Sequence, residues 1–158
     1  MSEGQIGGHG HLVVIDESPE SQLALRYAAR ITARSGGRLA LLHVLPKAEF
    51  MQWGGVQEAM AAEAQDRAEA LLAAAAQEAT RIGAAQPALS VRQGRAVDEV
   101  LAHLRENSHI HVLVLGAAQK GAPGPLVSFF SGEAAGQLPC LVVIVPGGLD
   151  METVDRLT

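Results

Sequence analysis

The sequence predicts an α/β fold, a three-layer α/β/α sandwich around an open, doubly wound sheet of five parallel strands. Five short apolar runs alternate with segments of helical period, and four of the runs are continuous, as in strands buried on both faces. In addition, 48% of the 158 residues are hydrophobic but only 3% are aromatic, so small aliphatic side chains must build the core. We expect strands at 11–15, 39–45, 88–93, 111–115 and 141–145. The third run alternates apolar and polar residues, which indicates an edge strand.

The segments between these runs carry helix signals. Ser18 is an N-cap candidate, Pro19 fits the first helical position, and the glycine pair at 36–37 ends the first helix. Further helices are expected at 57–82, at 96–105, and from the Gly-Pro pair at 124–125 to about 136–138. Alternating strands and helices with right-handed crossovers place a ligand crevice at the carboxyl ends of the strands.

Composition argues against several classes of function. The net charge is −5 and there is no basic run, so we expect no nucleic-acid partner. No apolar stretch reaches the roughly 18 residues of a membrane span, and no signal peptide is evident. The single cysteine, Cys140, cannot form an internal disulfide and is expected to be a buried small hydrophobe, so we expect a cytoplasmic protein.

Five segments in order resemble the universal stress protein family. They are VVIDES at 13–18 before an amphipathic helix, LLHV at 41–44, VRQG at 91–94, and the last two strands with Pro146. The resemblance implies strand order 3-2-1-4-5, with Asp16 and Gly116 facing each other across the crevice. It also implies one domain at 11–148 between a flexible N-terminal tail at 1–10 and a C-terminal tail at 149–158. Family members commonly form homodimers through the last strand, which the apolar edge from Leu141 to Val145 permits.

The phosphate loop departs from the family pattern. ATP-binding members carry G-x2-G-x9-G-[S/T] after the fourth strand. Counted from Gly116, the second glycine falls on Gln119, and the final pair falls on Phe129 and Phe130. Two phenyl rings there would either block a phosphate or face the core. A rearranged loop could still cradle an anion with other groups: Lys120, Gly121, Gly124 and the N–H groups after the proline at 125.

Each candidate binding residue has a purely structural alternative. The resemblance implies nucleotide contacts for Asp16 and Val44, but Asp16 also suits a helix cap and any apolar residue would serve at 44. A glycine at 116 suits a close turn whether or not a ligand binds. Ser128 and Ser131 could bond a phosphate or bond back to their own helix. The candidate nucleotide-binding residues are Asp16, Val44, Gly116, Lys120, Gly121, Gly124, Ser128 and Ser131.

Two histidine pairs, His9-x-His11 and His109-x-His111, precede neighbouring strands at matching distances. If the strands are in register, four imidazoles could meet at the amino edge of the sheet and bind Zn²⁺. The alternative is a set of solvated histidines without metal geometry, which we favour because no carboxylate or cysteine joins them. Clustered imidazoles would repel one another when protonated and loosen this edge below about pH 6.5.

No nucleophile, base and orienting group come together in the sequence. The first hypothesis is therefore a non-enzymatic stress-response protein that acts through dimerisation and protein contacts, with nucleotide binding weak or lost and no cofactor required. The alternative is a member that binds ATP or another adenine nucleotide through a rearranged loop from Gly116 to Ser131, with at most slow ATP hydrolysis. The loop containing Phe50 and Trp53 is long enough to act as a lid or a partner surface.

Overall fold

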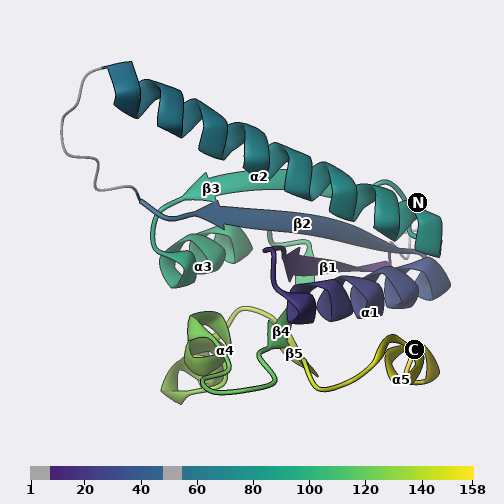
Figure 1. Cartoon of the computed structure of the whole chain (residues 1–158). Helices are drawn as coiled ribbons and strands as arrows, with labels where there is room; N and C mark the ends of the chain where they lie inside the picture. The colour runs from purple at the N-terminus through teal and green to yellow at the C-terminus, as the bar shows by residue number, and fades with distance from the viewer. Residues whose placement is uncertain (1–7, 48–54) are drawn as a thin grey trace, which may run out of the picture.

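The chain folds around one five-stranded, all-parallel sheet with strand order β3-β2-β1-β4-β5, which confirms the predicted fold class and order. The computed structural model describes residues 8–47 and 55–158. The strands are β1 (Gly8–Val14), β2 (Gly37–Leu45), β3 (Ala88–Gln93), β4 (Ile110–Ala117) and β5 (Leu141–Pro146). The helices are α1 (Pro19–Ser35), α2 (Gly55–Ile82), α3 (Ala96–Glu106), α4 (Pro125–Phe130), the 3₁₀ helix η1 (Glu133–Gln137) and α5 (Met151–Arg156). Figure 1 shows α2, the longest helix, running along β2 and β3.

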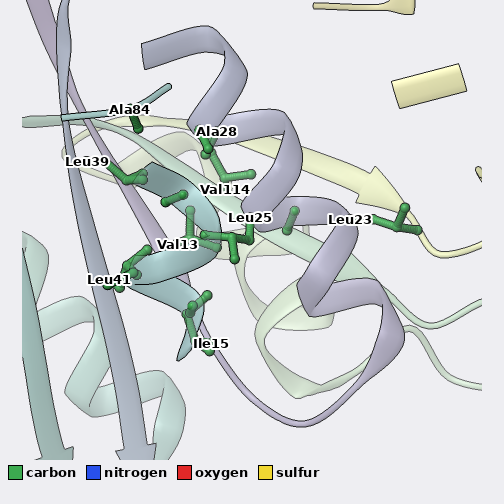
Figure 2. Close-up of a cluster of buried hydrophobic side chains, with 14 of the residues drawn as sticks. Val13, Ile15, Leu23, Leu25, Ala28, Leu39, Leu41, Ala84 and Val114 are labelled. Atoms are coloured by element: carbon green, nitrogen blue, oxygen red, sulfur yellow. The ribbon is translucent and has the colours of Figure 1, made fainter. Parts of the chain in front are cut away.

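Two hydrophobic clusters, one on each face of the sheet, make the core. The first joins the sheet to α1, α2 and α5, and the second joins it to α3 and α4. Figure 2 shows Val13, Leu41 and Val114 from three adjacent strands beside Leu25 and Ala28 of α1. All five side chains are at most 5% exposed, and burying one Val or Leu contributes about 1.5–3 kcal/mol. Small alanines on α1 let that helix lie close to the strands.

The start and end of α1 follow the predicted signals. Ser18 has extended backbone and its side chain accepts a hydrogen bond from the Ser21 N–H, while Pro19 occupies the first turn. Gly36 ends the helix with φ of 71°, in the left-handed region that favours glycine. These caps fix the position at which the chain leaves β1 and returns to β2.

The helix predicted from 124 to about 136–138 is interrupted. α4 ends at Phe130, and after Ser131 and Gly132 the chain resumes as η1. Gly132 has φ of −87° and ψ of −148°, which are not helical values. The backbone of Gly132 therefore separates two short helices where the apolar pattern suggested one.

The expected tails also need correction. Residues 8–10 belong to β1, and the expected C-terminal tail contains α5, which packs on α1. Asp150 caps α5 by accepting a bond of 2.7 Å from the Thr153 N–H. Val154 is only 1% exposed, and Asp155 receives two hydrogen bonds from Arg26 of α1. α5 is therefore part of the domain.

The sheet has two open edges, β3 and β5. The position of β3 agrees with the edge strand predicted from its alternating pattern. Leu89 on β3 is 42% exposed, while Leu141 and Ile144 on β5 are 72% and 37% exposed. The described part of the chain contains no helix long and apolar enough to cross a membrane.

Candidate functional site

A pocket of about 180 Å³ lies at the carboxyl ends of β1, β2 and β4, which we call the carboxyl-end pocket. It is lined by the turn after β1, the ends of β2 and β4, the start of α3 and the segment from Pro123 to Val127. In this strand order the connections on either side of β1 run in opposite directions along the sheet. The pocket is therefore at the switch point where open α/β sheets bind ligands.

Asp16 lines the pocket, but its carboxylate also builds the turn into α1. Its Oδ1 accepts hydrogen bonds from the Ser18 N–H, at 2.8 Å, and from the Ser18 hydroxyl. The Asp16 N–H donates to the Ser21 hydroxyl at 3.0 Å. These bonds stabilise the turn into α1. They explain why an aspartate stands at this position even if no ligand binds there.

The backbone of Val44 faces the end of β1. The Ile15 N–H donates to the Leu42 carbonyl at 2.7 Å, so the backbone of Leu42 faces β1. Successive residues of a strand point their backbone N–H and C=O groups to opposite sides, so residues two apart point the same way. The backbone groups of Val44 therefore point toward the side of β1, as those of Leu42 do, but at a level beyond the end of β1. Val44 lines the pocket, where these N–H and C=O groups can act as donor and acceptor.

His43 also lines the pocket, although its place in the sequence indicates only a strand residue. Its Nδ1 lies 2.6 Å from the carbonyl oxygen of Ile15. A carbonyl oxygen only accepts, so Nδ1 carries a proton and donates it to this bond. The only signal in the sequence was its position one residue before Val44 at the end of a strand.

The glycines of the predicted phosphate loop serve the backbone. A Cβ on Gly116 would lie 2.3 Å from the Glu20 carbonyl oxygen, so a glycine is required where β4 meets α1. Gly121 and Gly124 have φ of 74° and 112°, which allow the tight loop closed by the hydrogen bond from the Ala118 N–H to the Pro123 carbonyl. Among these glycines, Gly116 and Gly124 line the pocket.

Phe129 and Phe130 lie away from the pocket lining. Phe130 is 1% exposed within the second core cluster, and the half-buried Phe129 packs edge-to-face on it with ring centroids 5.1 Å apart. Ser131 donates to the Val127 carbonyl at 2.6 Å, which is a bond back to its own helix. The rings therefore leave the pocket open.

The structure brings four of the eight candidate residues to one pocket. Asp16, Val44, Gly116 and Gly124 line it, whereas the other four do not: Lys120, Gly121, Ser128 and Ser131. Lys120, Gly121 and Ser128 are exposed. The predicted loop from Gly116 to Ser131 therefore contributes Gly116 and the segment 123–127 to the pocket, while Lys120 and Gly121 lie at the surface.

The charge around the pocket is negative. Asp16 and Glu20 line it, and among the described lining residues there is no Lys or Arg. The first N–H groups of α4, at Leu126 and Val127, have no hydrogen-bond partner within their own helix and could donate to a ligand. Such a helix end supplies only about half a positive charge. Arg67 lines an adjoining cleft of about 390 Å³ that shares Asp16 with the pocket. The pocket therefore has more negative than positive charge at its wall.

At the opposite edge of the sheet, the histidines meet only in part. His9 and His111 place their Nδ1 atoms 3.4 Å apart, and the rings are nearly perpendicular. The pairing of β1 with β4 shifts by one residue between Gly10 and His11, so the two pairs are not in matched register. His11 is buried instead, and burial lowers its pKa, with further lowering from His9 and His111. In residues 8–47 and 55–158 no group of three or more metal-ligating side chains forms.

Cys140 is half-buried, and burial raises the pKa of its thiol. A raised pKa keeps the sulfur protonated and poorly nucleophilic near neutral pH. The expected lid or partner loop around Phe50 and Trp53 lies outside the described residues.

Comparison with known proteins identifies the family. A model described as the universal stress protein family matches residues 11–146. A universal stress protein UspA from Lactobacillus plantarum has a similar structure, with a TM-score of 0.75, 19% identity and coverage of 88% of this chain and 98% of that chain. An Arabidopsis thaliana family protein with AMP bound has a TM-score of 0.62 at 14% identity, covering 92% and 95% of the two chains.

A universal stress protein from Archaeoglobus fulgidus in complex with dAMP has a TM-score of 0.55 at 15% identity, covering 87% of this chain and 97% of that chain. A search of curated proteins found no match. At these identities the structural neighbours show the fold, and the family model covers most of the sequence. The chain therefore belongs to the universal stress protein family.

Proposed function

We propose that this chain is a non-enzymatic, cytoplasmic stress-response protein that acts through dimerisation and protein contacts and binds adenine nucleotides weakly. The observation that carries this proposal is the charge of the carboxyl-end pocket, where Asp16 and Glu20 are present and no lining residue that the structure describes is Lys or Arg. Phosphate groups are normally held by cations, helix N-termini or glycine-rich backbone. The pocket therefore offers little compensation for a triphosphate.

The size of the pocket supports the same proposal. At about 180 Å³ it is smaller than the roughly 300–1,000 Å³ typical of small-molecule sites. Structural neighbours have been solved with cAMP, AMP and dAMP. An adenine-containing ligand is therefore a reasonable class for this pocket, but a whole ATP would have to widen it.

Dimerisation is proposed through the free edge of β5. An unpaired edge strand presents backbone donors and acceptors that a second copy can pair with, and Leu141 at 72% exposure supplies apolar surface. Light scattering of the Leu141→Glu variant should give a monomer mass. The matched control is Leu89→Glu on the opposite edge strand, which should remain dimeric. A dimer that survives Leu141→Glu and dissociates with Leu89→Glu would place the interface on β3.

The alternative is an adenine-nucleotide-binding member with slow ATP hydrolysis. The observation in its favour is that Phe129 and Phe130 do not line the pocket. Phosphate release from ATP with Mg²⁺ separates the two proposals. The first expects release equal to that of the buffer, in wild type and in Asp16→Asn alike. Release that Asp16→Asn abolishes would favour the alternative.

A further inference from the structure

A second cavity lies between α1 and α2 and meets the carboxyl-end pocket only where β1 leads into α1. We call it the α1–α2 groove; its volume is about 410 Å³, within the roughly 300–1,000 Å³ typical of small-molecule sites. We propose that this groove binds a small amphipathic amine, with the ammonium at Asp16 and Glu17 and the apolar part between the two helices. The inference goes beyond the proposed function, because it adds a second ligand site to the chain.

The floor of the groove is apolar. Ile15 at the end of β1, Leu25 of α1 and Ala75 of α2 line it, and each is at most 8% exposed. Leu71 of α2 also lines the groove and packs against the first core cluster. Small-molecule sites are lined mainly by such side chains, with a few polar groups that fix the orientation of the ligand. A hydrocarbon segment placed here would be removed from water, which is favourable.

The polar part of the groove contains three carboxylates and one guanidinium, and two of these four groups are already paired. Arg26 donates two hydrogen bonds to Asp155 of α5, at 2.6 and 2.7 Å. Glu78 accepts two hydrogen bonds from Arg81, which lies one turn further along α2. A carboxylate on a ligand would therefore have to compete with Asp155 for Arg26.

Asp16 and Glu17 are the two charged groups that remain. Both are exposed where β1 meets α1, and within residues 8–47 and 55–158 neither carboxylate lies within 4.0 Å of a Lys or Arg nitrogen. Oδ1 of Asp16 accepts from Ser18, but a carboxylate has two acceptor oxygens, so the other stays available. An ammonium group has three donors and no acceptor. Burying a charge is costly unless it is paired, and these two carboxylates supply the pair.

One further cation lies near these carboxylates. Arg67 lines an adjoining cleft that shares Asp16, Glu17 and Leu71 with the groove, and it is exposed on α2. The two carboxylates exceed it by one negative charge, so the groove still favours a cation. Arg67→Gln should therefore strengthen the binding of an amine, which is an effect that loss of folding does not produce.

The C-terminal helix contributes to the groove. Met151 at the start of α5 lines it, and Arg26 belongs both to the groove and to the ion pair with Asp155 that holds α5 on α1. The family model ends at residue 146, so α5 lies outside the part of the chain that it matches. The groove is therefore built in part from an element beyond the matched family region.

The test is an NMR titration of the ¹⁵N-labelled whole protein with hexylamine, 1-hexanol and hexanoate. These compounds share a six-carbon chain, and at pH 7 their head groups are a cation, a neutral group and an anion. Hexylamine should give saturable shifts at the amides of Leu25, Leu71 and Ala75, and at low salt it should bind roughly tenfold more tightly than hexanoate. Raising the ionic strength from about 0.01 to 1 M should narrow that difference, because salt screens the carboxylates.

Matched variants test the apolar and the charged part separately. Ala74 lines the groove and Ala73 does not, and both are exposed on α2. Ala74→Leu should weaken hexylamine binding roughly tenfold by filling the groove, while Ala73→Leu should leave it unchanged. Glu17→Gln should weaken the binding of hexylamine but not of 1-hexanol. Glu63→Gln, the same charge change on an exposed part of α2 outside the groove, should affect neither.

Three results would overturn the inference. Hexanoate binding as tightly as hexylamine would contradict the charge selection. Shifts centred on Gly116 and Val127 would place the amine in the carboxyl-end pocket instead. No saturable shift with any of the three compounds up to about 10 mM would mean that the groove is not a ligand site. None of these results bears on the proposed function, which phosphate release and light scattering test separately.

Discussion

Replacing Gly116 by alanine tests whether this glycine serves the fold rather than a ligand. The added Cβ would lie 2.3 Å from the Glu20 carbonyl oxygen and 2.5 Å from its carbon, where ordinary contacts are 3.4–4 Å. Both contacted atoms are backbone, so no side-chain rotation relieves the overlap and α1 must move away from β4. Overpacking of this kind costs about 1–3 kcal/mol, and the reduced freedom of the unfolded chain returns about 0.4–1 kcal/mol. We expect Gly116→Ala to lower the free energy of unfolding by about 1–2 kcal/mol.

The assay is urea denaturation followed by circular dichroism, with Gly136→Ala as the control. A Cβ on Gly136 meets nothing within 4 Å, and its φ is not in the left-handed region, so that variant should be neutral or slightly stabilised. Gly116→Ala within about 0.5 kcal/mol of the control would refute the close approach of β4 and α1. The loss is expected without any ligand, so an effect on nucleotide binding at this position would not by itself assign Gly116 to the site.

Three further results are expected. Phe130→Ala should lower the free energy of unfolding by about 3–5 kcal/mol because its ring is buried, whereas Phe129→Ala should lower it clearly less. Equal losses for the two variants in urea denaturation would contradict the burial of Phe130. Val154→Ala should cost roughly 2 kcal/mol while exposed Leu157→Ala costs almost nothing; equal Tm values would mean that α5 does not pack on the domain. Burial lowers the pKa of the His103 imidazole, so the unfolded chain binds a proton more readily than the folded chain. The free energy of unfolding should therefore rise as the pH is raised to about 6.5. The same pH dependence of stability in a His103→Gln variant would assign that rise to other groups.

The sequence predicted the strands well where hydrophobicity determines them. The four continuous apolar runs fall in β1, β2, β4 and β5, and the first three of these strands lie inside the sheet. β5 was expected to be buried on both faces as well, but it is an edge strand on which Leu141 is 72% exposed. The start of β1 was missed because Gly8 and Gly10 pair through their backbone, with Gly37 and Ile110, and contribute no side chain. A Cβ on Gly10 would lie 2.3 Å from the His109 carbonyl oxygen, so close approach rather than hydrophobicity selects this residue.

The C-terminal helix was missed for a different reason. α5 has six residues, too few for a helical period to emerge, and its side chain buried most deeply is Val154. It is held by a cap at Asp150 and by the ion pair of Arg26 with Asp155, residues far apart in sequence. Short helices depend on such tertiary contacts because helix nucleation is unfavourable.

The candidate site could be predicted in position but not in detail. The order of strands placed Asp16 and Gly116 at one crevice, and both line the carboxyl-end pocket. The orientation of Phe130 and the hydrogen bond of His43 depend on packing and on strand register. Both arise from contacts between residues far apart in the sequence, so the local sequence pattern does not predict them. The sequence pattern therefore gave the location of the pocket, and the structure added the charge and the acceptors at its wall.

The most direct test of the central claim is the affinity of the purified protein for ATP with Mg²⁺. A pocket lined by Asp16 and Glu20 predicts no saturable heat below millimolar ATP in isothermal titration. A Kd in the micromolar range, about −8 kcal/mol of binding free energy, would contradict the account. In that case the loop after β4 must hold the phosphates in a way that the negative pocket wall does not prevent.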